Sequence, residues 1–115
     1  MIKNEMYESS IRTKGDFGAF FEYDFDTGYF YLCKMRSKGN LKIISHNHIL
    51  SGTPDFKERD VIIKWDPTET KVGLYIRDQL WAVFDVETNA KYGGNYRSGN
   101  KLNIPFEILC CLESN

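Results

Sequence analysis

Apolar and aromatic side chains recur at every second position over residues 17–25 and again over residues 29–35. This period of two is that of a β-strand with one buried face. The short segment Asp26-Thr27-Gly28 lies between the two runs, and Gly28 can adopt the positive φ that tight hairpin turns require. We therefore predict a β-hairpin. One face of its first arm carries Phe17, Ala19, Phe21, Tyr23 and Phe25, and one face of its second arm carries Tyr29, Tyr31, Cys33 and Met35.

The middle of the chain predicts four more strands. A polar turn at 36–40 precedes a strand at 41–50, and a charged loop at 51–60 follows, with one helical turn after Pro54. Three shorter strands are expected at 61–65, 71–76 and 79–86. The last of them has apolar residues on both faces, which favours a central position in its sheet.

The C-terminal quarter gives weaker patterns. Residues 89–103 contain Gly93-Gly94 and several asparagines, so we expect a flexible loop. In the tail at 103–113, Asn103 can cap a helix and Pro105 can lie in its first turn, although the apolar run also suits a buried strand. A short helix is the preferred interpretation.

These segments predict a mainly β protein, either an antiparallel β-sandwich or a strongly curved sheet of about six to eight strands, with at most one or two short helices. The length of 115 residues fits one domain, 1–115. Aromatic residues make up 15% of the chain, a high share that also favours strands, because flat rings pack well on a pleated surface.

Composition excludes several function classes. The formal net charge of -1 argues against duplex nucleic-acid binding, which usually needs a basic excess. No apolar run approaches the ~20 residues of a membrane-spanning helix, and the N-terminus has no secretory-signal pattern, so we expect a cytoplasmic protein that binds neither nucleic acid nor membrane. The three cysteines, Cys33, Cys110 and Cys111, are expected to be reduced and largely buried.

His46 and His48 are the only histidines, and on a strand they point to the same face. This spacing suits a metal pair, but no motif supplies the remaining ligands, and no phosphate-binding context accompanies them as an acid–base pair. A structural or surface role is therefore favoured over metal binding and catalysis. We predict no catalytic residue, no metal site and no cofactor.

An acidic group is the more informative cluster. Asp16, Glu22, Asp24 and Asp26 fall within eleven positions that contain no Lys or Arg. Like charges at this spacing have no structural benefit, so an ordinary solvated face and a negative patch for a basic protein partner are the main alternatives. The sign reverses just beyond, at Lys34, Arg36, Lys38 and Lys42, in a stretch too short to predict nucleic-acid binding.

The glycine-rich segment at 92–101 lacks the order of residues that cradles phosphate. It carries Tyr92, Tyr96 and Arg97, residue types that often anchor protein interfaces, although a plain solvent loop is also compatible. For Cys110-Cys111, packing is favoured over a redox or metal role.

Three motifs resemble one known family. They are Asp-Thr-Gly-Tyr-Phe-Tyr at 26–31, Trp65-Asp66 followed by Lys-Val-Gly-Leu-Tyr-Ile at 71–76, and Leu-Trp-Ala-Val-Phe-Asp at 80–85. The order is similar to that of a small bacterial β-rich family of unknown function, over about residues 20–88. The wider profile is similar to the immunity proteins of bacterial toxin systems, including those of contact-dependent growth inhibition. That resemblance implies a non-enzymatic domain that binds and neutralises one toxin domain.

The residues therefore predict a protein-binding domain, and the resemblance implies an immunity protein whose partner is a basic toxin domain such as a nuclease. The predicted contact residues are Glu22, Asp24, Asp26, Tyr92, Tyr96 and Arg97. The alternative is a small enzyme or ligand-binding protein that uses His46 and His48. The sequence leaves the choice between monomer and homodimer open.

Overall fold

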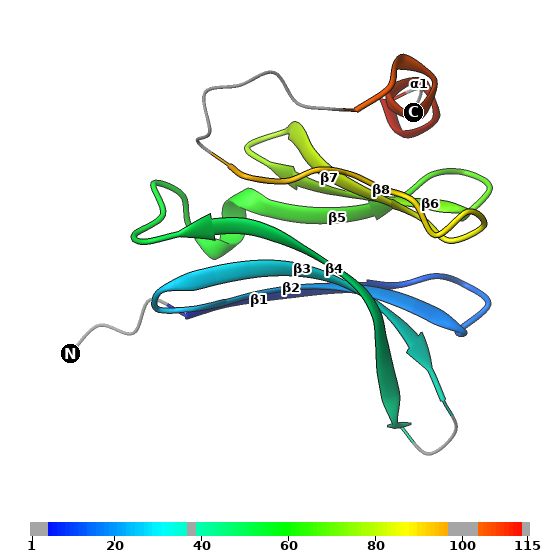
Figure 1. Ribbon diagram of the computed structural model, residues 1–115, viewed down its shortest axis with the longest axis horizontal. Coiled ribbons are helices and arrows are strands. Elements are labelled where there is room, and N and C mark those ends of the chain that lie inside the picture. Colours follow the sequence, from blue (N-terminus) through cyan, green and yellow to red (C-terminus); the bar gives the residue numbers. More distant parts are fainter. Residues whose placement is uncertain (1–4, 37–38, 97–103, 114–115) are drawn as a thin grey trace.

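Two four-stranded antiparallel sheets pack face to face in a computed structural model that describes residues 5–36, 39–96 and 104–113 (Figure 1). The first sheet has the order β1 (Glu5–Ile11), β2 (Phe17–Asp24), β3 (Thr27–Met35) and β4 (Leu41–Ser51). The second has the order β5 (Val61–Trp65), β6 (Lys71–Ile76), β7 (Gln79–Asp85) and β8 (Lys91–Gly93). A 3-10 turn, η2 (Glu58–Asp60), precedes β5, and the helix α1 (Phe106–Glu113) follows β8. The predicted β-sandwich is confirmed.

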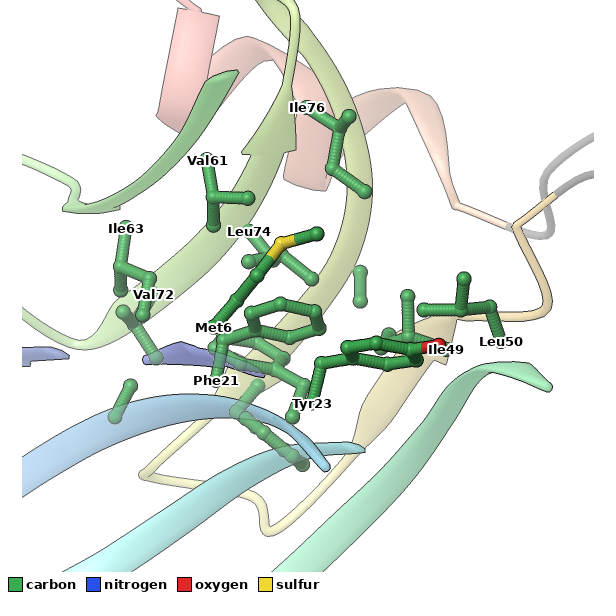
Figure 2. Packing of buried hydrophobic residues seen from close by; sticks show 14 of the residues in the cluster. Met6, Phe21, Tyr23, Ile49, Leu50, Val61, Ile63, Val72, Leu74 and Ile76 are labelled. Atoms are coloured by element: carbon green, nitrogen blue, oxygen red, sulfur yellow. The ribbon is translucent and has the colours of Figure 1, made fainter. Parts of the chain in front are cut away.

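The core lies between the two sheets. Phe30 of β3 is fully buried, and its ring lies 4.8 Å from that of Phe84 on β7. Figure 2 shows Met6, Phe21 and Tyr23 of the first sheet near aliphatic side chains of the second. The alternation that predicted the hairpin therefore identifies the buried face of β2 correctly, with one exception. Phe25 lies beyond the strand at a φ of 82° and is 50% exposed, because the chain has already entered the turn.

The outer face of the second sheet is covered by α1 (Figure 1). Ile108 and Leu112 of the helix are buried against Tyr75 and Val83, and the Tyr75 hydroxyl donates to the Leu112 carbonyl at 3.2 Å. The preferred interpretation of the tail as a short helix is confirmed. The expectation of buried thiols holds for Cys33 only, since Cys110 is exposed on this helix and Cys111 is partly exposed.

Two strands were not predicted. β1 has polar residues at most positions, and its single buried apolar residue, Met6, gives too weak an alternation to identify a strand at the edge of the sheet. β8 lies inside the segment predicted as a flexible loop, so that prediction is wrong for residues 91–93. Only three residues form β8, and its glycine gives no alternation to recognise.

The segment that contains β8 joins the two sheets. The Gly94 amide donates to the Trp81 carbonyl of β7, whereas the next two amides, of Asn95 and Tyr96, donate to the His48 and Ile49 carbonyls of β4. At the opposite edge of the sandwich, the Trp65 indole donates to the Ser10 carbonyl at 3.2 Å. Both edge strands of the first sheet, β1 and β4, are therefore joined to the second sheet by hydrogen bonds.

β4 bends strongly away from the core at its N-terminal end, as Figure 1 shows. Its register against β3 slips twice, once between Gly28 and Tyr29 and once between Leu32 and Cys33. Each slip leaves one residue of β4, Ile49 and then Ile44, without a partner on β3. Such bulges bend a strand and increase its twist. The last residues of β3 and the first residues of β4 consequently extend beyond the sandwich (Figure 1).

A candidate protein-binding face

Four strands contribute side chains to the outer face of the first sheet, the side turned away from the core. The pairing register places its residues in rows that run across the strands. One row contains Tyr7, Glu22, Tyr29 and His48, and the next contains Ser9, Phe20, Tyr31 and His46. The outer side of a β-sandwich is usually polar, so these two rows are unusually rich in rings.

The rings of these rows contact one another. Tyr29 and Tyr31 stack with their centroids 5.9 Å apart. Tyr29 also forms T-shaped pairs with His46 and His48, with ring centroids 6.0 and 5.5 Å apart. The helix α1 covers the outer face of the second sheet, whereas no helix of the described chain covers this face of the first sheet (Figure 1). Tyr29 therefore lies at the centre of a preformed aromatic surface.

The face becomes aliphatic towards the β3–β4 hairpin tip. Its third row contains Ile11, Gly18, Cys33 and Ile43. Ile11 and Ile43 are 50% and 51% exposed, whereas Cys33 between them is buried. Burial raises the pKa of the Cys33 thiol, which disfavours the reactive thiolate. Large exposed apolar patches on single domains usually mark sites of interaction with other molecules.

The other end of the face is acidic. Glu22 lies between Tyr7 and Tyr29, and Asp24 lies opposite Glu5 on the neighbouring strand. All three carboxylates are exposed. The pKa of the Tyr31 hydroxyl is raised, first by burial and then by the nearby Glu22 carboxylate. An aromatic centre beside an acidic margin suits a partner that presents apolar surface next to basic side chains.

The structure separates the predicted acidic group. Glu22 and Asp24 share the outer face, and Asp26 lies exposed in the turn just beyond them. Asp24 also accepts the Thr27 amide at 3.2 Å, so this carboxylate helps to form the hairpin turn. Asp16 lies at the opposite end of β2 and has a structural contact of its own.

Asp16 and Arg12 form a bidentate ion pair in the turn between β1 and β2. Arg12 donates from Nε and Nη2 to the two Asp16 oxygens at 2.6 and 2.8 Å, and from Nη1 to the Glu69 carbonyl at 2.7 Å. The guanidinium also lies 4.9 Å from the Phe17 ring centroid. The hydrogen bonds from Arg12 hold the pKa of Asp16 at about 2, below its usual 3.8. Asp16 therefore stabilises the contact between the sheets.

Removing this carboxylate gives a pH-dependent loss of stability. A lowered folded-state pKa stabilises the fold above the unfolded pKa, and this contribution disappears as the pH falls through the folded value. Because the Asp16 side chain is 33% exposed, solvent screening limits the contribution to about 1 kcal/mol. Urea unfolding of Asp16→Asn should show this deficit at pH 6, and the deficit should vanish between pH 4 and pH 2. In the Arg12→Met background, the stability lost through Asp16→Asn should be small at pH 6 as well as at pH 2. An undiminished loss at pH 6 would show that the ion pair with Arg12 is not its cause.

His46 and His48 lie on the same face, as the sequence predicted, and both rings border Tyr29. His48 contacts the Asn95 Oδ1 at 3.2 Å through Nδ1 and the Ser51 hydroxyl at 3.0 Å through Nε2. Among the described residues, no group of three His, Cys, Asp or Glu side chains could hold a metal ion. The observed contacts of His48 orient its ring within the aromatic surface.

The second group of predicted contact residues lies elsewhere. Tyr92 packs partly buried against the cluster beneath α1. The Tyr96 ring lies 5.1 Å from Phe56 and 4.6 Å from Trp81, and its hydroxyl donates to Asp55 at 2.7 Å. Tyr96 therefore packs at the margin of the core. Arg97 lies outside the described residues.

Sequence reasoning grouped Tyr29, Tyr31, Cys33 and Met35 correctly on one face, but it did not identify that face as the outer one. The register also adds Tyr7 and Phe20, which come from two other strands. One signal was available. Glu22 and Asp24 alternate with buried rings on β2, so their partners across the strands must share the solvent side.

Two antiparallel sheets, a single covering helix and an exposed aromatic face define a small β-sandwich domain. Over residues 2–101 the chain matches the family described as "Uncharacterized protein conserved in bacteria" (DUF2251), and it belongs to that family. The match extends well beyond the resemblance over about residues 20–88. No curated protein and no solved structure gives a significant match. No helix in the described parts of the chain is long and apolar enough to cross a bilayer.

Proposed function

We propose that this chain is a non-enzymatic immunity protein that binds and neutralises a basic bacterial toxin domain. The observation that carries the proposal is the exposed aromatic face of the first sheet with carboxylates at one margin. Tyr7, Tyr29 and Tyr31 supply ring surface, and Glu22 and Asp24 supply negative charge next to it. A toxin that acts on nucleic acid carries a basic active site, which this combination would fit.

The two kinds of residue have different roles in this proposal. Tyrosines bury a large rigid area with few rotatable bonds, so they contribute affinity at small entropic cost. The exposed carboxylates act over a longer range and increase the rate of association with a basic partner. Tyr29 and Tyr31 are already stacked, so the surface is formed before a partner arrives.

Charge reversal on the acidic margin tests this function. We expect the double variant Glu22→Arg with Asp24→Arg to weaken toxin binding by more than tenfold, mainly through slower association. The probe is the toxin domain that a pull-down with this chain recovers from its native host, and surface plasmon resonance at several salt concentrations measures both rates. Growth of cells that express the toxin domain measures protection.

A matched control carries the same change of charge at a distance from the face. Glu87 and Glu107 are exposed, one after β7 and the other on α1, and their double change to Arg should leave affinity and protection within about twofold. Equal losses in both double variants would indicate a general charge effect. Unchanged affinity in Glu22→Arg with Asp24→Arg would exclude the acidic margin from the interface.

A further inference from the structure

β4 is an edge strand whose outer edge is only partly covered. The Asn95 and Tyr96 amides donate to the His48 and Ile49 carbonyls, and the Lys91 ammonium donates to the His46 carbonyl at 2.7 Å. Among the described residues, no hydrogen bond joins another segment to the outer edge at residues 41–45. The backbone there remains available to pair with an added strand.

Three of the five side chains of this open segment are apolar and exposed. Leu41, Ile43 and Ile44 are 46%, 51% and 39% exposed, and the segment contains no proline. Exposed edges normally carry charges or proline, or are covered by other groups, and here Lys42 is the single charge. The edge formed by β1 is covered in this way, since Glu58 accepts the Tyr7 amide at 2.9 Å.

The two faces of the open segment differ in chemistry. Leu41 pairs with Met35 on the outer face, whereas Lys42 pairs with Lys34 on the opposite face. The exposed Arg36 follows directly after β3. In the described chain none of these three cations forms a salt bridge with a carboxylate. The segment therefore presents apolar side chains on one face and unneutralised positive charge on the other.

We propose that residues 41–45 capture an extended segment of another protein by strand addition. The incoming strand has apolar side chains at alternate positions, which lie beside Leu41 and Ile43, and carboxylates between them, which lie beside Lys42. Backbone hydrogen bonds supply affinity in this mode of recognition, and the alternating side chains supply specificity.

Charge selects this occupant over a second copy of the chain. Antiparallel pairing of two such segments would place the Lys34 and Lys42 pairs of both copies on the same face, where like charges repel. An acidic strand neutralises them instead. The proposal is separable from the toxin-binding function. The open edge shares Ile43 with the aliphatic row of the outer face, but it contains no residue of the aromatic rows or of the acidic margin, and its charge is opposite.

The probe is a capped hexapeptide in which isoleucine alternates with glutamate, added to the full-length protein. Amide hydrogen exchange followed by NMR should show new protection at residues 41–45, and chemical shift titration gives the Kd. Lys42→Glu should weaken binding at least tenfold and should create binding of the isoleucine–lysine peptide. Lys64→Glu, a matched change on β5, should leave the preference for the glutamate peptide intact.

Backbone pairing is tested with two N-methylated forms of the glutamate peptide, methylated at odd or at even positions. Only one edge of the added strand faces β4, so one form should lose binding and the other should retain it. Equal binding of both forms, no protection at residues 41–45, or equal affinity in wild type and Lys42→Glu would overturn the proposal. Concentration-dependent protection of the same amides without peptide would assign the edge to a second copy and would overturn it as well.

Discussion

Gly93→Ala should destabilise the protein by about 3 kcal/mol or more, a large part of the 5–15 kcal/mol typical of a domain. Gly93 has a φ of +78°, and a Cβ placed there would lie 2.2 Å from the Trp81 carbonyl oxygen and 3.2 Å from the Ala82 Cα. Both atoms belong to the backbone of β7, which cannot rotate away. The chain must therefore shift where it passes from β8 to the edge of β4, and the hydrogen bonds made there weaken.

Gly15→Ala is the matched control. Gly15 has a φ of +80°, almost the same as Gly93, but no atom beyond its two chain neighbours lies within 4 Å of a Cβ placed on it. The free energy of unfolding of this variant should fall by only about 1 kcal/mol, the intrinsic cost of alanine in the left-handed conformation. Urea unfolding of both variants measures the difference. Equal losses would mean that the close approach to β7 adds nothing to the conformational cost.

The same glycine explains why the sequence predicted a loop in this region. Gly-Gly and neighbouring asparagines are typical of flexible connections, and they are equally typical of places where two backbones approach closely. Composition cannot separate these cases, because the deciding feature is the Trp81 carbonyl of another strand. The hairpin of β2 and β3 was predictable for the opposite reason, since its alternation is local in sequence, although the positive φ lies at Phe25 and not at the predicted Gly28, which already belongs to β3.

The candidate site shows the same division between local and non-local information. The acidic residues Glu22 and Asp24 were found from one stretch of chain. The aromatic face was not, because Tyr7 and Tyr29 lie on opposite sides of Glu22 through the pairing of three strands. The packing of Tyr96 was not predictable for a related reason, since its partners Phe56 and Trp81 are distant in sequence.

Phe30→Ala should cost about 3–5 kcal/mol of stability, the range observed when a buried phenylalanine is truncated. Phe30 has no exposed surface, and it packs against Phe84 at the contact between the two sheets. Alanine leaves a cavity that the rigid strands on both sides cannot close. Thermal and urea unfolding measure this loss of stability. At low temperature, where the variant remains folded, it should still bind the toxin domain, because the Phe30 ring does not reach the outer face.

Phe20→Ala completes the comparison, because Phe20 lies on the adjacent strand with its ring turned to the opposite side of the sheet. It is partly exposed and pairs with Tyr31 in the aromatic rows. Truncation there should cost about 1 kcal/mol of stability or less. If the outer face binds the partner, Phe20→Ala should instead reduce affinity tenfold or more, as loss of an aromatic anchor does. Two neighbouring phenylalanines would then separate folding from binding. An affinity that depends on Phe30 rather than Phe20 would remove the binding role from this face.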